Sequence, residues 1–267
     1  MNEETRATIH DVVRSARLWH IWTRLGIQDV RLRFRRSALG PAWIFVNLAV
    51  LVISIGFIYA NLLGQDPREF LPYLTAGLIM WLYLTNTIVE GGGAFVNSEG
   101  YIRQISLPIY VYVFRAFVSV ALTMLITLGA FAVVVAIYRV PVSVGTLFAI
   151  PGLLLVMITS LLLIAIFAHL NARFRDIAHM AAIGMNVLFY MTPVIFPADL
   201  LRRRRHLAFV VELNPAYHLI EVVRHPLVAA APAEWHTYVA VAVIIGVLAV
   251  CAAAVIAVFQ RRIVFAL

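Results

Sequence analysis

Six long apolar blocks dominate the sequence, and each is long enough to cross a lipid bilayer as a helix. One crossing needs about 20 predominantly apolar residues. Because lipid offers no hydrogen-bond partners, a spanning segment must satisfy its own backbone, as an α-helix does. The sequence therefore predicts an all-α integral membrane protein with six transmembrane helices. The blocks are Ala42–Leu62, Leu71–Phe95, Tyr112–Tyr138, Leu147–Leu170, Ala178–Phe196 and Tyr238–Phe259.

The composition leads to the same class. Of the 267 residues, 63% are hydrophobic and 13% are charged, whereas a soluble domain is about half apolar and a quarter charged. The basic residues are all arginine, and the net charge is +8. These arginines lie in short runs between apolar blocks, which is the pattern of membrane flanks. We therefore expect membrane lipids as partners and no nucleic acid.

The chain divides into an N-terminal cytoplasmic interface segment, residues 1–40, and a six-helix transmembrane domain, residues 41–267. Within this domain, residues 197–236 separate the fifth and sixth blocks. This stretch is partly apolar, but Pro215, Pro226 and Pro232 interrupt it. Broken backbone is tolerated at membrane depth where protein or a water-filled cavity covers it. We expect short re-entrant or interfacial helices there.

Arginine counts in the short loops predict the orientation. Cytoplasmic loops carry an excess of basic residues, and the bias here favours both termini inside. The run Arg202–Arg205 falls on the outer side and argues against that bias. The inner set is Arg6 to Arg36, Arg103, Arg115, Arg173, Arg175, Arg261 and Arg262, and the outer set is Arg68, Arg139, Arg202–Arg205 and Arg224.

The N-terminal segment has the pattern of an amphipathic helix. At 100° per residue its arginines gather on one side and its apolar residues on the other, which predicts a helix lying in the membrane interface. Gly40-Pro41 would end it. Its arginines either fix the topology or grip an anionic headgroup. One face holds Arg17, Arg24, Gln28, Arg31 and Arg35, and the other holds Val12, Trp19, Gly26, Val30 and Phe34.

Several chemistries lack their motifs. Without lysine, the phosphate-binding loop GxxxxGK[ST] cannot occur, so an energy source must sit on another chain. The five aspartates are scattered, and the eight histidines form no compact ligand cluster. We therefore assign no catalytic residue and no metal site. The glycines of Gly91–Gly93 lie within an apolar block, where we expect close helix approach or a bend.

Glu90 is the one acid well inside a predicted span. A membrane-buried ionisable group is a functional candidate by default, because burying its charge is costly. It would support an ion-coupled transporter. The alternative is an ion pair with an arginine, or a position near the water interface.

Four segments resemble one family, the bacterial polysaccharide ABC exporter permeases of type 2, which carry O-antigen, capsule or teichoic acid. The four lie in the family's order and cover nearly the whole chain. They are Arg31–Trp43 (RLRFRRSALGPAW), Tyr101–Arg115 (YIRQISLPIYVYVFR), Leu170–Asp176 (LNARFRD) with Met191–Pro197 (MTPVIFP), and Leu213–Arg224 (LNPAYHLIEVVR).

The resemblance implies a homodimer of six-span subunits in the bacterial inner membrane, with two separate nucleotide-binding ATPase subunits that hold ATP and Mg. The cargo would be a polysaccharide, O-antigen in first place, linked to undecaprenyl diphosphate. This chain would be no enzyme and would carry no cofactor of its own. The run Arg202–Arg205 departs from the family's pattern, and a solvated face or an anionic partner would explain it.

The resemblance also implies roles for particular residues. A coupling helix around Arg103–Pro108 would contact the ATPase, and the turn Leu39-Gly40 would form part of the cytoplasmic entrance. The region Pro197–Pro232 would form the periplasmic gate, with Asn214, Pro215, Tyr217 and Glu221. We assign the diphosphate headgroup to Arg31, Arg33, Arg35 and Arg36, and the coupling contact to Arg103, Gln104, Ile105, Ser106, Leu107 and Pro108. Candidates for the channel lining are Trp81, Tyr83, Glu90, Phe189 and Tyr190; interface or packing positions are the alternative for its aromatic members.

Other functions remain open at this point. Within the same class the cargo could be teichoic acid, capsule polymer or a small hydrophobic drug. From other classes, a membrane-embedded polyprenyl-phosphate glycosyltransferase would need an acid-rich motif that the sequence lacks. An ion-coupled transporter would rest on Glu90 alone.

Overall fold

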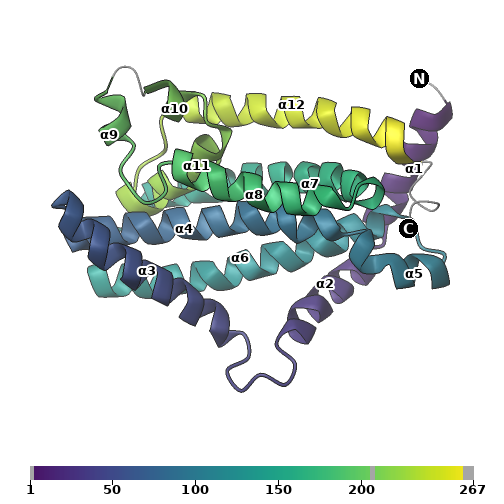
Figure 1. The fold of residues 1–267 in the computed structure, drawn as a ribbon, viewed down its shortest axis with the longest axis horizontal. Coiled ribbons are helices and arrows are strands. Elements are labelled where there is room, and N and C mark those ends of the chain that lie inside the picture. Colours follow the sequence, from purple (N-terminus) through teal and green to yellow (C-terminus); the bar gives the residue numbers. More distant parts are fainter. Residues whose placement is uncertain (1–2, 205–207, 261–267) are drawn as a thin grey trace.

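The computed structural model describes residues 3–204 and 208–260, which form helices and connecting turns with no strand in these two ranges. Long helices lie side by side and make up most of the molecule (Figure 1). They are α3 (Ala42–Leu63), α4 (Pro67–Val89), α6 (Tyr110–Tyr138), α7 (Ala149–Arg173), α8 (Asp176–Met191) and α12 (Trp235–Phe259).

The long helices give the molecule two ends. One, here called the α5 end, carries α1 (Glu3–Arg17), α5 (Glu99–Gln104) and the last turn of α12. The other, the α9 end, carries α9 (Asp199–Arg202), α10 (Ala208–Glu212) and the start of α12. Helix α2 (Trp19–Arg33) and α3 form a V below the bundle in Figure 1, joined by an eight-residue turn.

Four of the six predicted spans are confirmed as helices long and apolar enough to cross a membrane. The two others differ from the prediction. Helix α4 begins with the charged pair Arg68-Glu69 and ends at Val89, six residues early. Helix α8 has 16 residues and is therefore about 24 Å long, shorter than a hydrocarbon core of about 30 Å. The confirmed spans are Ala42–Leu62, Tyr110–Tyr138, Val144–Arg173 and Trp235–Phe259.

Helix α4 lies at the centre of the bundle. Its Leu74, Ile79 and Met80 have no exposed surface, and the helix packs against α3, α6, α7, α8 and α11 (Pro215–Ala229). In contrast, only 17% of the α3 span and 11% of the α12 span are buried within the chain. These two helices therefore present their apolar surface to lipid or to another chain.

The triple glycine brings α4 close to α7, as expected. After Val89 the chain tightens into two 3₁₀ turns, η1 (Gly91–Gly93) and η2 (Val96–Ser98). A Cβ added to Gly91 would lie 2.7 Å from Cγ1 of Ile164, and one added to Gly92 would lie 2.8 Å from Cβ of Phe167. Only glycine fits such a contact.

The N-terminal segment is two helices, whereas the sequence predicts one. Helix α1 ends at Arg17 and α2 begins at Trp19. In a continuous helix the Ser15 carbonyl would accept from the amide of residue 19. Here it accepts from the amide of Leu18 at 3.0 Å and from the indole of Trp22 at 3.2 Å. The tryptophan therefore stabilises the break.

Helix α2 also ends earlier than Gly40. Its last residue is Arg33, and Arg36 has a left-handed φ of 69° that stops the helix. The predicted apolar face packs partly on protein, since Gly26 and Val30 are buried against α6. A Cβ at Gly26 would lie 2.8 Å from the carbonyl oxygen of Arg115. The exposed Trp19 remains available to a membrane interface.

The region 197–236 contains the short helices that its prolines predict. Helices α9 and α10 have four and five residues, and α11 has fifteen. Pro215 occupies the first turn of α11, where its missing N–H costs nothing. Helix α11 packs between α4, α7 and α12, so the region is fastened to the bundle.

Candidate functional site: the arginine turn and two ion-pair clusters

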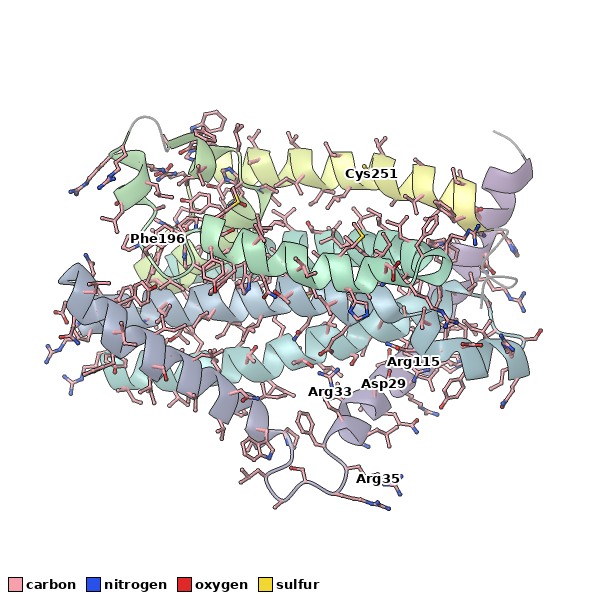
Figure 2. The ribbon with its side chains drawn as sticks, viewed as in Figure 1. Asp29, Arg33, Arg35, Arg115, Phe196 and Cys251 are labelled. Atoms are coloured by element: carbon pink, nitrogen blue, oxygen red, sulfur yellow. The ribbon has the colours of Figure 1, made fainter. Side chains whose placement is uncertain are left out.

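The end of α2 and the start of the turn that follows it, residues 31–36 (here called the arginine turn), carry a dense set of arginines. Arg31, Arg35 and Arg36 are exposed, and Figure 2 shows Arg35 pointing away from the bundle. Leu39 is half exposed, and Gly40 adopts a left-handed φ of 54°. The turn residues predicted to form the entrance thus lie together on one exposed loop, outside the packed helices.

Arg33 differs from its neighbours because it is paired. Its Nη2 lies 2.5 Å from Oε2 of Glu90, and its Nη1 donates to Oε1 at 3.3 Å. Both side chains are about two-fifths exposed. Glu90 therefore takes the ion-pair alternative, at the point where α4 gives way to η1. The pair joins the arginine turn to the glycine turn.

A second ion pair, which sequence reasoning missed, lies one helical turn away on α2. Arg115 of α6 donates from Nε and Nη2 to the two carboxylate oxygens of Asp29, at 2.7 and 2.6 Å. Such bidentate pairs are geometrically specific. The Arg115 guanidinium also lies 4.9 Å from the centroid of the Tyr101 ring in α5. A possible signal was Asp29 itself, the lone acid in the arginine-rich stretch 14–36.

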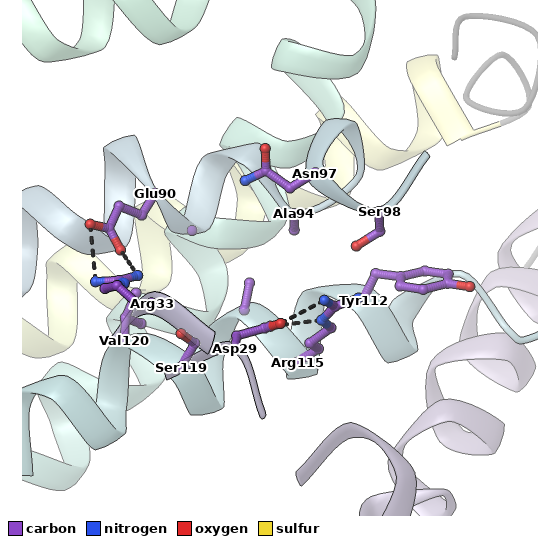
Figure 3. Close-up of a pocket in the computed structure, with 12 residues that line it drawn as sticks. Asp29, Arg33, Glu90, Ala94, Asn97, Ser98, Tyr112, Arg115, Ser119 and Val120 are labelled. Carbon is purple, nitrogen blue, oxygen red and sulfur yellow. Dashed lines mark hydrogen bonds and ion pairs between the residues drawn. The ribbon is translucent and has the colours of Figure 1, made fainter. Parts of the chain in front are cut away.

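These two ion pairs flank a cavity of about 270 Å³ (Figure 3). The cavity lies between α2, the turns after α4, and α6, and the polar side chains of Asn97, Ser98 and Ser119 also line it. Two guanidinium groups and two carboxylates therefore face one small polar space near the α5 end.

A neighbouring cavity of about 250 Å³ opens where the turn meets the bundle. Its lining includes Arg33 and Phe34 at the end of α2 and Trp43 at the start of α3. Although it lies among apolar helices, it contains polar groups from three of them. These are Asn47 of α3, Tyr83 and Asn86 of α4, and Thr123 and Thr127 of α6. A polar group entering from the arginine turn would find hydrogen-bond partners there.

The predicted coupling helix lies a few residues earlier than expected. Helix α5 spans Glu99–Gln104, so Arg103 and Gln104 lie in it, and the stretch from Ile105 to Pro108 does not. Ile105 is extended, at φ −127° and ψ 125°. Leu107 precedes Pro108, and a residue before proline avoids helical geometry, so the helix does not continue through Leu107. The exposed surface comprises Tyr101 and the residues from Arg103 to Ser106.

The predicted gate residues come together at the α9 end. The Asn214 side chain caps α11, accepting from the amides of Ala216 and Tyr217, and donates to Oγ1 of Thr192 at 2.9 Å. Pro215 follows as the first residue of α11. Tyr217 is buried, and Glu221 pairs with Arg224 at 2.5 Å. The hydrogen bond between Asn214 and Thr192 joins the start of α11 to the end of α8.

Arg224 organises this end of the molecule and was not among the predicted site residues. Its side chain is 1% exposed. It donates from Nη1 to the Pro193 carbonyl at 2.9 Å and lies 4.0 Å from the centroid of the Tyr73 ring. Burial alone would raise the pKa of Glu221, but Arg224 and hydrogen bonds from His225 and Arg224 lower it to about 2. The available signal was the helical i,i+3 spacing of Glu221 and Arg224.

The candidates for the channel lining divide. Trp81 and Tyr83 are buried within this chain, and Trp81 packs on Phe189 with ring centroids 5.3 Å apart. These contacts favour helix packing for Trp81 and Phe189. Tyr190 is 77% exposed. Of the run Arg202–Arg205, Arg202 pairs with Glu212 at 3.0 Å, Arg203 and Arg204 are exposed, and Arg205 lies outside the described residues.

Comparison with known proteins agrees with this picture. The model of the family described as ABC-2 type transporter matches residues 22–228, from α2 through nearly all of α11. The chain belongs to the ABC-2 type transporter family. It is a transporter membrane subunit, a multi-pass permease, and not itself an enzyme.

Two curated relatives are similar over most of the permease. One is the O-antigen export system permease protein RfbA of Myxococcus xanthus, 24% identical over 195 residues. The other carries the same name in Klebsiella pneumoniae and is 21% identical over 194 residues. Each alignment covers 72% of this chain and 74% of the relative.

Among residues 3–204 and 208–260, no group of three histidine, cysteine or acidic side chains is placed to hold a metal.

Proposed function

We propose that the permease moves an undecaprenyl-diphosphate-linked polysaccharide, O-antigen in first place, across the bacterial inner membrane. The observation that carries the proposal is the exposed arginine turn between α2 and α3, next to a cavity among the helices that contains polar groups from α3, α4 and α6. A diphosphate is a good partner for guanidinium groups. The names of the two relatives support the same cargo.

Three arginines of the turn are available for the headgroup. Arg31, Arg35 and Arg36 are exposed, whereas Arg33 is engaged with Glu90. We therefore assign the first contact with the diphosphate to these three and a positioning role to Arg33. The sugar nearest the lipid would then face the cavity lined by Asn47, Asn86 and Thr123.

ATP hydrolysis would occur on two separate nucleotide-binding subunits, which would hold ATP and Mg. The family supports such a partner, and the absence of lysine rules out the usual phosphate-binding loop here. Helix α5 and the exposed residues up to Ser106 would contact the ATPase. Movement there would reach α2 through the Tyr101–Arg115–Asp29 contacts.

The assembly would be a homodimer of six-span subunits with both termini in the cytoplasm. The poorly buried α3 and α12 leave apolar surface for a second copy or lipid. The helices alternate in direction, so that the predicted inner arginines, such as Arg103 and Arg173, lie at the α5 end. That end would then face the cytoplasm, and residues 197–236 would form the periplasmic gate.

Reconstitution into vesicles with a candidate ATPase tests the proposal. We expect ATP-dependent translocation of lipid-linked polysaccharide. Replacing Arg31, Arg35 and Arg36 by glutamine should lower translocation about tenfold or more, because charged hydrogen bonds contribute about 1.5–3 kcal/mol each. The matched control replaces Arg68 and Arg139, two exposed arginines outside the arginine turn and outside residues 197–236, by glutamine, and it should leave translocation unchanged.

The same experiment separates the alternatives. Unchanged export by the triple variant would contradict the headgroup assignment. Transport driven by an ion gradient without ATP would favour an ion-coupled transporter, and sugar transfer without ATP would favour a glycosyltransferase. ATP-dependent export of teichoic acid, capsule polymer or a drug, but not of O-antigen, would keep the class and change the cargo.

A further inference from the structure

A third cavity, rich in polar groups, lies at the α9 end, away from the arginine turn. It has a volume of about 220 Å³ and is enclosed by four parts of the chain: α4, residues 197–202, α11 and the start of α12. In Figure 2 the labelled Phe196 marks this region. The cavity is smaller than the about 300–1,000 Å³ that drug-sized ligands occupy, so it suits a single small group.

The back wall of this cavity is fixed. Arg224 is buried between Glu221, the Pro193 carbonyl and the Tyr73 ring. The Tyr73 hydroxyl lies within 3.3 Å of the carbonyl oxygens of both Pro193 and Phe196. Since these groups hold each other, the wall is pre-organised, which lowers the cost of binding a ligand.

The lining of the cavity combines basic and acidic side chains. Its lining contains three basic side chains, Arg202, Arg224 and His225, and three acidic ones, Asp199, Glu221 and Glu234. An anion such as phosphate would meet the three carboxylates, and a metal ion or ammonium would meet the three basic groups. A cavity of this composition therefore disfavours ligands with a net charge.

A neutral molecule with several hydroxyl groups fits such a lining. Each hydroxyl donates one hydrogen bond and accepts others. Carboxylates supply acceptors, guanidinium groups supply donors, and hydrogen bonds to charged groups are stronger than neutral ones. The buried Tyr217 and Thr237 add hydroxyl groups to the same lining.

We propose that the cavity at the α9 end binds one neutral sugar residue of the polymer as it passes the region 197–236. The inference rests on the proposed function, because it takes its ligand class from a polysaccharide cargo. It places a sugar subsite at the α9 end, away from the headgroup site on the turn between α2 and α3, so that the permease would contact the polymer at two separate places.

The test is saturation-transfer NMR on the full permease with its ATPase in lipid nanodiscs. The probes are the methyl glycosides of mannose, galactose and rhamnose, added one at a time. The variant combines Asp199→Asn with Glu234→Gln, both at exposed positions. The control, Glu69→Gln, removes an exposed carboxylate from the first turn of α4, outside the cavity lining.

We expect saturation transfer to at least one glycoside in the wild type and the control, and a signal about fivefold or more lower in the double variant. An equal signal in the double variant would overturn the inference. Displacement of the glycoside by inorganic phosphate would also overturn it, as would no glycoside signal in a preparation that exports polysaccharide.

Translocation measured on the same preparations keeps the two proposals apart. If the preparation exports polysaccharide and the double variant at Asp199 and Glu234 binds the glycoside as well as the wild type, the sugar subsite is refuted and the proposed function is not. Glycoside binding that depends on both residues, without any ATP-dependent export, would refute the proposed function and leave the cavity a sugar site. Unfolding midpoints equal to the wild type within experimental error confirm that the variants are folded.

Discussion

Both ends of the permease contain arginine–carboxylate ion pairs, but the pairs differ in burial and in how far apart their residues lie in the sequence. Near the α5 end, the ion pairs Arg33–Glu90 and Asp29–Arg115 join residues that are 57 and 86 positions apart in the sequence. Their side chains are partly exposed. At the α9 end, Arg224 and Glu221 are three residues apart on one helix, and the arginine is buried. The α5 pairs can separate and rehydrate, whereas the α9 pair cannot do so without unpacking α11.

The largest expected effect comes from removing the buried arginine. Arg224→Ala should lower the free energy of unfolding by about 3–5 kcal/mol, because the largely buried Glu221 would lose its arginine partner and keep only the contact with His225. Denaturant unfolding of the purified permease measures it. The matched double variant, Arg224→Met with Glu221→Gln, should recover most of the loss. If the single variant were as stable as the wild type, the α9 end would not be the rigid one.

A smaller effect is expected at the partly buried Asp29–Arg115 pair. A double-mutant cycle with Asp29→Asn and Arg115→Gln should give a coupling energy of about 1–3 kcal/mol, as for side chains in direct contact. We also expect each single variant to reduce the ATPase stimulation by more than its loss of folded protein would explain, since Arg115 also contacts Tyr101 of α5. A coupling energy near zero would mean that the two helices are held by packing alone.

The exposed Arg33–Glu90 pair should matter little for stability. Arg33→Gln is expected to cost about 0–1 kcal/mol, as surface ion pairs do, and this cost should shrink in high salt. Denaturant unfolding at low and high ionic strength measures it. A loss above that range, unaffected by salt, would show that the pair is more enclosed than its exposure indicates.

The smallest effect is a pH dependence at His225. The hydrogen bond that it donates to Glu221 raises the pKa of His225 above its ordinary value of 6.5, against the opposing effect of burial. A raised pKa in the folded state stabilises the fold below pH 6.5, and the gain is lost as the pH rises through the folded value. His225→Asn should therefore lower the thermal unfolding midpoint more at pH 6 than at pH 9. An equal decrease at both would contradict the pairing.

The sequence predicts the fold class well, because apolar block length is a local property. The four confirmed spans follow from it, and the prolines of residues 197–236 correctly predict short helices. Two features of the N-terminal segment could not be predicted, for physical reasons. The break at Leu18 depends on the Trp22 indole reaching the Ser15 carbonyl, and the end of α2 depends on the backbone of Arg36. Neither feature can be predicted from the spacing of the hydrophobic residues.

The site shows the same division. Exposed arginines before the first span are visible in the sequence, and their exposure is confirmed for Arg31, Arg35 and Arg36. The partner of Arg33 lies 57 residues away, and that of Arg115 lies 86 residues away, so only the packing of α2 on α6, beside the end of α4, reveals them. Roles in the headgroup, channel and gate remain predictions.

The break between α1 and α2 has a mechanical consequence. Helix α1 is fastened to the last helix, since the Thr8 hydroxyl donates to Oε1 of Gln260 at 2.6 Å, while α2 is fastened to α6 by Gly26 and Asp29. A single residue, Leu18, joins the two helices. The N-terminal segment is thus two helices joined at one residue: α1 contacts both α6 and Gln260 at the end of α12, whereas α2 packs on α6. Because α2 packs on α6 and is joined to α1 by Leu18 alone, a displacement of α6 would carry the arginines at the end of α2 with it, and Leu18 is the point at which the angle between α1 and α2 would change.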